Sequence, residues 1–312
     1  MIDLSEVKSG MVSNMKVNGL MVKILRKQIL GQIKRRRKGY PPHGEFTEFL
    51  NIPYINDGNP QHTFDIFLAK ENRKSICIID IHGGSYIFGH HQDNYPFAYV
   101  FLKEGFDVVT LDYQPNDGKM DTKDLIDDVA KNINYLFAHL KEYNLENDQF
   151  VISGDSAGGH IALTITEALL DEEYAKELGY GFSNINIKAC LVNGPVYDFV
   201  HIGEGAMTNS GMKRMFGPNY LDKEAFALIC PKTHLSSLTC PLFVSTCKND
   251  FLRLQSLVLN EDMKVKNNKF KFVDLDCDDK KVGHVHNVIA TQLPESIEVN
   301  KAMMAFIEEN IK

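Results

Sequence analysis

The stretch GDSAG, Gly154–Gly158, decides the fold of this 312-residue chain. It has the form G-x-S-x-G, with a strand-like apolar run before it at residues 149–153 and a helix-like run of small and apolar residues after it. A serine hydroxyl is a weak nucleophile unless it stands on a sharp strand-to-helix turn with a base beside it. The two outer glycines allow such a turn without Cβ clashes. The pattern therefore predicts that Ser156 is a nucleophile.

A second motif lies upstream, where the apolar run of residues 75–81 leads directly into His82-Gly83-Gly84. Attack of a serine on an acyl group creates an oxyanion, which requires two or three N–H donors aimed at it. We expect Gly83 and Gly84 to donate two of these, and Ala157, the residue after the nucleophile, to donate the third. An isolated HGG sequence is more simply a tight turn, and its position ahead of the GDSAG stretch favours the oxyanion interpretation.

The acid and the base are expected after the serine, in the order Ser, acid, His. Asp250 follows a strand-like run at residues 241–245, and the carboxyl ends of strands carry the functional loops in α/β proteins. Either His284 or His286, after the next strand-like run, is the expected base. Four other carboxylates are weaker candidates for the acid because their loop must deliver the histidine: Asp274, Asp276, Asp278 and Asp279.

Together, the motifs HGG-S-Y-x-x-G, GDSAGG, K-N-D and G-H-V-x-N-V resemble those of the hormone-sensitive-lipase-like esterases and lipases, from about Thr63 to the C-terminus. This resemblance implies an α/β-hydrolase fold, in which a mostly parallel sheet has helices on both faces and a helical cap. The family pattern assigns the base to His284. It assigns the remaining roles to the same residues as above: nucleophile Ser156, acid Asp250, and oxyanion donors Gly83, Gly84 and Ala157.

The chain departs from its relatives at two places in these motifs. Ser85 stands where many relatives carry a third glycine, and His286 occupies a position that is often aromatic. Three residues are expected to line the substrate pocket: Tyr86, Asp155 and Met212. Asp155 is also a candidate structural acceptor, and Met212 is equally compatible with a helix core. The adjacent pair His90-His91 is interpreted as polar loop residues, and no metal site is expected.

Two segments are expected to form the cap. Residues 1–45 form an N-terminal helical segment with a basic run at residues 34–38, and residues 46–312 form the hydrolase domain, with an irregular cap insertion around 197–235. Residues 1–40 carry 10 Lys and Arg against 2 Asp and Glu, whereas the remainder carries 24 against 39. We interpret the basic run as a solvated helix end; the alternative is binding to an anionic membrane surface or to nucleic acid.

Composition limits the class of protein. The hydrophobic content of 44% is ordinary for a globular protein, and no apolar run is long enough to span a membrane. The N-terminus does not resemble a secretory signal, and the six cysteines show no metal-binding or disulfide spacing. These features predict a cytoplasmic protein without cofactor, nucleic-acid partner or stable membrane insertion; a homodimer is left open.

The predicted function is a serine hydrolase of the carboxylesterase or lipase type, which cleaves small, short-chain acyl esters through a Ser-His-Asp triad and an acyl-enzyme. An amidase of the same fold, such as an arylformamidase or a peptidase, is the first alternative. A non-catalytic binding protein on a hydrolase fold is the second, and its signature would be a broken triad.

Overall fold

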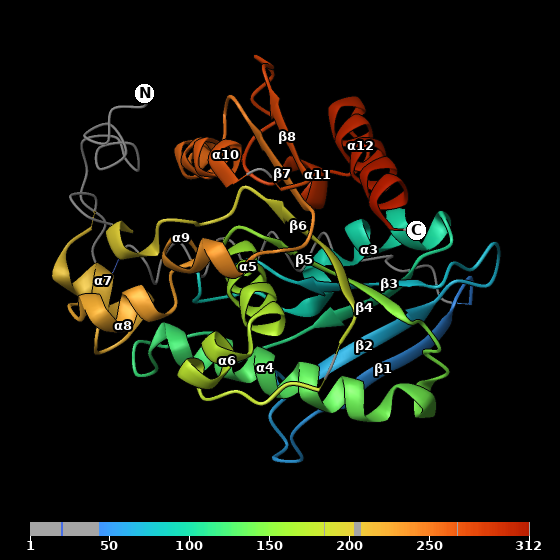
Figure 1. Ribbon diagram of the computed structural model, residues 1–312, viewed down its shortest axis with the longest axis horizontal. Helices are drawn as coiled ribbons and strands as arrows, with labels where there is room; N and C mark the ends of the chain where they lie inside the picture. Colours follow the sequence, from blue (N-terminus) through green and yellow to red (C-terminus); the bar gives the residue numbers. More distant parts are fainter. Residues whose placement is uncertain (1–19, 21–43, 184, 203–206, 267, 312) are drawn as a thin grey trace.

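A computed structural model describes residue 20 and residues 44–183, 185–202, 207–266 and 268–311, and an eight-stranded sheet forms its centre (Figure 1). The strands lie in the order β1-β2-β4-β3-β5-β6-β7-β8. Strand β2 is antiparallel to both of its neighbours, and all pairs from β4 to β8 are parallel. The bounds are β1 Thr47–Pro53, β2 Thr63–Leu68, β3 Ile76–Ile81, β4 Asp107–Leu111, β5 Gln149–Asp155, β6 Ile187–Asn193, β7 Leu242–Cys247 and β8 Phe270–Leu275.

Helices cover both faces of the sheet (Figure 1). Helices α4, α5, α6 and α10 pack on one face, and α3, α11 and α12 pack on the other. The bounds are α3 Tyr95–Lys103, α4 Thr122–His139, α5 Ala157–Leu170, α6 Glu172–Leu178, α7 Asn209–Phe216, α8 Lys223–Leu228, α9 Pro231–His234, α10 Arg253–Lys266, α11 His286–Ile289 and α12 Pro294–Asn310, with the 3-10 turns η1 His91–Asn94, η2 Leu140–Tyr143, η3 Phe199–His201 and η4 Leu235–Ser237. The predicted α/β-hydrolase architecture is confirmed.

Strand β3 shows how the sequence builds both cores. Its six residues are all buried, and side chains along a strand alternate between the two faces. Cys77, Ile79 and Ile81 join the core under α4 and α5, while Ile76 and Ile78 join the core under α3 and α12. Such a two-sided strand needs a nearly continuous apolar run, which is what residues 76–81 provide apart from Asp80.

The strand order places the functional loops together. Strand β4 lies on one side of β3, and β5, the next strand in the chain, lies on the other. The loops that follow β3 and β5 therefore leave the sheet in opposite directions and open a crevice at the carboxyl ends of these strands, where α/β proteins bind ligands. The GDSAG and HGG motifs flank this crevice, and the loops after β6 and β7 lie next to it.

The segment predicted as a cap insertion, 197–235, contains short helices only, namely η3, α7, α8, α9 and η4, in the part that the structure describes. Helices α7, α8 and α9 lie together at the left of the view in Figure 1, with α9 next to α5. Three aromatic rings, Phe199, Phe216 and Phe226, bury this segment against the main core. The predicted N-terminal cap segment, 1–45, lies outside the described residues except for residues 20, 44 and 45.

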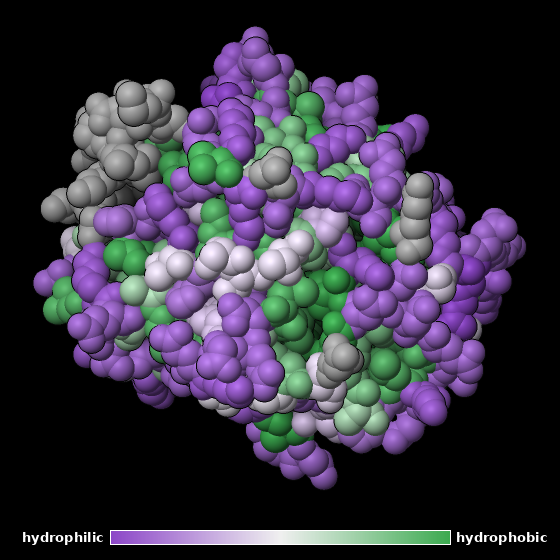
Figure 2. Space-filling model, in the orientation of Figure 1, coloured by the Kyte–Doolittle hydropathy of each residue, from purple (hydrophilic) through white to green (hydrophobic). Residues whose placement is uncertain are grey.

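The surface seen in Figure 2 is largely hydrophilic, with apolar residues gathered near its centre. Among the described residues, no helix combines the length and the apolar character that crossing a membrane requires.

Candidate active site

Ser156 occupies a strained turn between β5 and α5. Its backbone has φ +54° and ψ −118°, a combination that a residue with a Cβ rarely adopts, so the surrounding structure must hold it in place. Both flanking glycines are required by close contacts. A Cβ on Gly154 would lie 2.4 Å from the carbonyl oxygen of Gly158, and a Cβ on Gly158 would lie 2.2 Å from that of Ile81. This is the geometry of a nucleophile elbow.

The structure brings two of the predicted partners together at the ends of neighbouring loops. Nδ1 of His284 donates a hydrogen bond of 2.7 Å to Oδ1 of Asp250, and Asp250 is buried. The same carboxylate accepts from the Leu252 N–H at 2.7 Å and from the Thr246 hydroxyl at 3.1 Å. With its proton on Nδ1, His284 presents an unprotonated Nε2, and this buried atom has no hydrogen-bond partner among the described residues.

His286 and the competing carboxylates are engaged elsewhere. Nδ1 of the buried His286 contacts the Ser296 hydroxyl at 2.9 Å, on the side of α12. The other four carboxylates each have another contact: Asp274 pairs with Arg253 at 2.7 Å, Asp276 and Asp278 pair with Lys248 at 3.2 and 2.6 Å, and Asp279 accepts from the Lys281 N–H at 2.9 Å. The geometry thus favours Asp250 and His284 as the acid and base.

Asn249 holds the loop that carries His284. Its side-chain amide donates to three carbonyl oxygens of that loop, those of Cys277, Asp279 and Val282, at 3.0–3.2 Å. Because Asn249 anchors this loop at several points, it helps to hold His284 next to Asp250, the residue that follows Asn249 in the chain. The sequence motif K-N-D contained this residue without revealing its role.

Gly194, which the sequence analysis did not single out, connects the serine with the acid and base. It follows Asn193, whose carbonyl oxygen accepts the Ser156 N–H at 2.9 Å. A Cβ on Gly194 would lie 2.6 Å from Oδ2 of Asp250 and 3.1 Å from Nδ1 of His284. The end of β6 therefore lies between Ser156 and the Asp250–His284 pair, and a side chain there would displace that pair.

The loop after β3 adopts an unusual backbone conformation. Gly84, Ser85 and Tyr86 have φ values of +134°, +50° and +65°. Consecutive residues with positive φ turn their N–H groups away from the usual secondary-structure partners. A Cβ on Gly84 would lie 1.9 Å from the carbonyl oxygen of Phe88, so this position accepts glycine only.

Gly83 does not fit its predicted role as an oxyanion donor. Its N–H donates to Oδ1 of Asp155 at 2.9 Å, and each residue has a single backbone N–H. By contrast, within the described part of the chain no residue accepts the N–H of Gly84 or Ser85. Asp155, predicted to line the pocket, is buried and holds this loop, and burial raises the pKa of its carboxyl group.

His82 connects the loop after β3 with Asp112 at the end of β4. Its Nδ1 lies 2.6 Å from the Gly83 carbonyl oxygen and its Nε2 lies 2.9 Å from Oδ1 of Asp112. Both partners accept hydrogen bonds, so both ring nitrogens donate and the ring is an imidazolium. Burial lowers the pKa of His82, but the hydrogen bond and the charge of Asp112 outweigh burial, and the net shift is upward. The Tyr113 ring stacks on His82 at 4.4 Å.

The interpretation of His90-His91 as polar loop residues is wrong for His91, which is fully buried. Its Nδ1 lies 3.2 Å from Oδ2 of Asp112 and its Nε2 lies 3.0 Å from Oδ2 of Asp65. Burial lowers the pKa of His91, but the two carboxylates outweigh it and raise the pKa to about 9. An ion pair of this kind stabilises a buried charge.

Three of these groups, His90, His91 and Asp112, lie close enough to hold a metal ion. The Gln92 N–H donates to Nδ1 of His90, so the proton of that ring is on Nε2, which faces Asp112 at 3.3 Å. His91 is protonated between two carboxylates. A metal ligand must offer a lone pair, and the ring nitrogens of His90 and His91 that face Asp112 both carry a proton instead. We therefore interpret the cluster as an ion-pair network.

The remaining predicted pocket residues belong to the cap side of the core. Tyr86 is buried, and its hydroxyl contacts Nδ1 of His160 at 3.2 Å. Met212, on α7, is partly buried against the same core. Two other methionines, Met207 and Met215, pack against Ile87–Phe88, which follow the unusual turn after β3. Their place next to this loop makes them stronger candidates for an acyl pocket than Met212.

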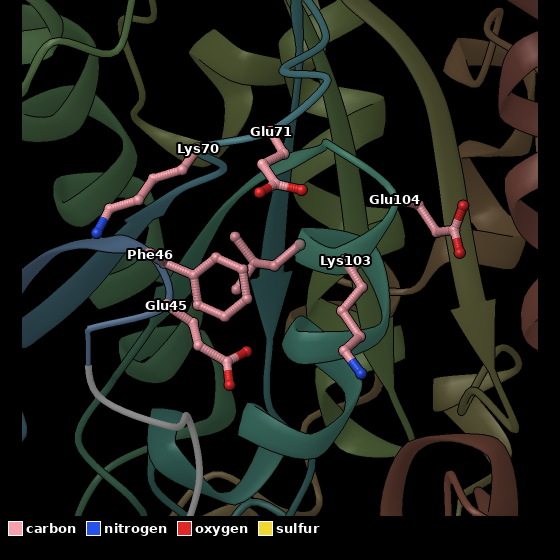
Figure 3. A pocket seen from close by; sticks show the side chains of 7 residues that line it. Glu45, Phe46, Lys70, Glu71, Lys103 and Glu104 are labelled. Atoms are coloured by element: carbon pink, nitrogen blue, oxygen red, sulfur yellow. The ribbon is translucent and has the colours of Figure 1, made fainter.

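A surface groove of about 650 Å³ lies away from this site (Figure 3). It is lined by Glu45, Phe46, Lys70, Glu71, Leu102, Lys103 and Glu104. Lys70 and Glu71 follow β2, and Glu104 precedes β4, so the groove lies at the amino end of the parallel strands. Ser156 lies at the opposite, carboxyl end. The groove contains no residue of the proposed catalytic machinery.

Comparison with solved structures supports the fold. Esterase B from Lactobacillus rhamnosis superposes with a TM-score of 0.79 at 22% identity, and the match covers 92% of this chain and 93% of that one. A bacterial heroin esterase superposes with a TM-score of 0.65 at 17% identity, covering 96% of this chain and 95% of that one. At these identities the likeness concerns the fold.

The matches to curated relatives cover a smaller part of each protein. A probable carboxylic ester hydrolase, LipM, from Mycobacterium tuberculosis is 26% identical over 180 residues, which is 56% of this chain and 41% of the relative. A probable isoprenylcysteine alpha-carbonyl methylesterase, ICMEL1, from Arabidopsis thaliana is 24% identical over 152 residues, 48% of this chain and 32% of the relative. The chain thus spans less than half the length of these relatives. The sequence model of the BD-FAE family matches residues 64–262, more than half of the chain, and the chain therefore belongs to the BD-FAE family.

Proposed function

We propose that this protein is a serine carboxylesterase that cleaves small esters through an acyl-enzyme. The observation that carries the proposal is the Asp250–His284 hydrogen bond of 2.7 Å, made beside the strand end that also holds the strained Ser156 turn. An acid-base pair next to a serine on a sharp turn is the arrangement that activates a serine hydroxyl. The kinship with esterases in sequence and fold points the same way.

In the proposed mechanism, Nε2 of His284 accepts the proton of the Ser156 hydroxyl as the oxygen attacks the ester carbonyl carbon. Asp250 keeps the Nδ1 proton in place and stabilises the imidazolium that forms. The imidazolium then gives its proton to the departing alcohol, and an acyl group remains on Ser156. Water repeats the attack, with His284 again as the base, and releases the acid.

The oxyanion requires donors that are not already used. Because the Gly83 N–H is occupied by Asp155, we assign the donors to Gly84, Ser85 and Ala157. The Gly84 and Ser85 N–H groups support this assignment, because no described residue accepts either of them. Removal of one such donor costs roughly 100- to 1,000-fold in turnover.

The alcohol side of the ester lies against the base, because His284 delivers its proton to the leaving group. The ring of Phe251, which is 54% exposed, lies 4.2 Å from the His284 ring. An exposed aromatic ring in contact with the base would offer an apolar surface to the alcohol group. The segment 197–235, with its short helices, is the proposed cap on the acyl side.

Esters of increasing acyl length provide the test. The protein should hydrolyse p-nitrophenyl acetate and butyrate, turn over p-nitrophenyl palmitate poorly, and react with a fluorophosphonate probe at Ser156. Matching p-nitroanilides serve as the control for amidase activity. Turnover of anilides without turnover of esters would contradict the proposal in favour of an amidase, and no reaction with the probe would favour a binding protein.

A further inference from the structure

One buried acid near the site has no role in the triad mechanism. Asp80 interrupts the apolar run of β3 and is 2% exposed. Burying an ionised carboxylate in a central strand is costly unless it is paired or hydrogen-bonded. On the neighbouring strand β5, Ser153 stands opposite Asp80, and Asp155 follows two residues later. All three side chains lie on the face of the sheet that α3 covers.

A single amide group connects Asp80 with the oxyanion loop, the segment Gly83–Tyr86 that follows β3 and carries two of the proposed donors. Nδ2 of Asn94, at the start of α3, lies 2.8 Å from Oδ2 of Asp80 and 2.8 Å from Oδ1 of Asp155. An amide nitrogen carries two hydrogens, so it donates one to each carboxyl group. Asp155 in turn accepts the Gly83 N–H at 2.9 Å. The contacts thus run from Asp80 through Asn94 and Asp155 to Gly83.

The two carboxyl groups are not equivalent. Oδ1 of Asp155 accepts two N–H groups, whereas Oδ2 of Asp80 accepts one. Oδ1 of Asp80 is buried without a hydrogen-bond partner among the described residues. When two buried carboxyl groups lie near each other, the charge of one disfavours ionisation of the other, and the proton stays on the member whose charge is less stabilised. That member is Asp80.

We propose that Asp80 is a proton-dependent positioning residue for the oxyanion loop, which holds Asp155 and Gly83 in place through Asn94 while it is protonated and loosens them when it ionises. The proposal rests on the esterase function proposed above. Once Asp80 is ionised, two like charges flank one amide, and repulsion weakens the hold of Asp155 on Gly83. The added negative charge of Asp80 also opposes the oxyanion that forms on the substrate beside this loop.

The groups around Asp80 place its ionisation in an accessible pH range. Burial, followed by the charge of Asp155, raises the pKa of Asp80 to about 7. The groups that oppose this rise are Asn94 at the start of α3, Ser153 on β5 and the positive His82 on the loop. Activity should therefore decline as the pH rises through about 7.

The test is the pH profile of steady-state hydrolysis of phenyl acetate from pH 5.5 to 9.5 by the full chain. Wild type should lose about tenfold in kcat as Asp80 ionises, which corresponds to roughly 1.4 kcal/mol. Asp80→Asn keeps an acceptor for Asn94 but cannot ionise. Its kcat should therefore show no decline as the pH rises through about 7, whereas any increase of kcat at lower pH should remain as in wild type. The control is Asp107→Asn, another buried strand aspartate, which pairs with Arg73 away from this loop and should keep the wild-type profile.

Two further measurements keep the proposal open to contradiction. Asn94→Leu should lower kcat about tenfold or more with little change in KM, because it breaks the connection to Asp155. The pH dependence of thermal unfolding should differ between wild type and Asp80→Asn from pH 4 to 7, even if the variant is inactive. A decline near pH 7 that persists in Asp80→Asn, or identical unfolding profiles, would overturn the proposal. Absence of ester hydrolysis at every pH in wild type would instead refute the proposed function.

Discussion

Gly194 lies so close to Asp250 that a methyl group on its Cα would stand 2.6 Å from the Oδ2 atom of the carboxylate. Its φ of +50° also disfavours any side chain. Gly194→Ala should therefore displace the Asp250–His284 pair and lower kcat/KM by about 100-fold or more, because small misplacements of catalytic groups are costly. The matched control is Gly181→Ala, where an added Cβ meets no atom within 4 Å. Equal activity of the two variants would contradict this role of Gly194.

The Asp65–His91–Asp112 ion pairs predict a pH-dependent stability. The pKa of His91 is about 9 in the folded protein, above its ordinary value of 6.5. Its contribution is therefore fully present below pH 6.5 and is lost as the pH rises through 9, with a total of about 3 kcal/mol. Denaturant unfolding at pH 6 and pH 10 measures the loss. His91→Gln should be less stable at pH 6 and should lose less between the two values; a variant that loses as much as wild type would contradict the ion-pair assignment.

Phe251 should affect the alcohol side of the substrate and leave the acyl side unchanged. Its exposed ring contacts the ring of His284, and aromatic contacts contribute roughly 0.5–1.5 kcal/mol beyond buried area. Phe251→Ala should lower kcat/KM for benzyl acetate by about tenfold and for ethyl acetate by less than about threefold. Leu221→Ala, which truncates an exposed apolar residue on the cap segment, is the control. An equal loss for both esters would show that Phe251 acts on the base and not on the alcohol.

Sequence patterns were most informative where chemistry and backbone geometry require the same residues. The GDSAG stretch predicted the turn at Ser156, and K-N-D predicted a carboxylate that the structure places 2.7 Å from His284. Gly154 lies against Gly158 and Ala162 across the turn, and Gly158 lies against the end of β3, so the motif reports tertiary contacts directly. Residue spacing alone left His284 and His286 open, because they stand two positions apart at the start of the same short helix, and only the family resemblance assigned the base to His284.

Other residues of the site could not be recognised because their roles depend on partners distant in the sequence. Gly194 stands in an ordinary Asn-Gly-Pro turn, and only the approach of the loop after β7 makes a side chain impossible there. The burial of His91 depends on Asp65, which lies on β2, and on Asp112, which directly follows β4. The hydrogen bond from the Gly83 N–H to Asp155, which speaks against Gly83 as an oxyanion donor, likewise joins residues distant in the sequence. Strand β1 and helix α12 carry weak periodic patterns and were not anticipated.

The most direct test of the proposed active site compares three variants, Ser156→Ala, His284→Ala and His286→Ala, in hydrolysis of p-nitrophenyl acetate at pH 7. Removal of a triad nucleophile or base commonly costs about 10⁴-fold or more in turnover. We predict that loss for Ser156→Ala and His284→Ala, and a loss below about tenfold for His286→Ala, whose ring contacts Ser296. Activity retained in His284→Ala but abolished in His286→Ala would contradict the assignment of Asp250 and His284 as the acid and base.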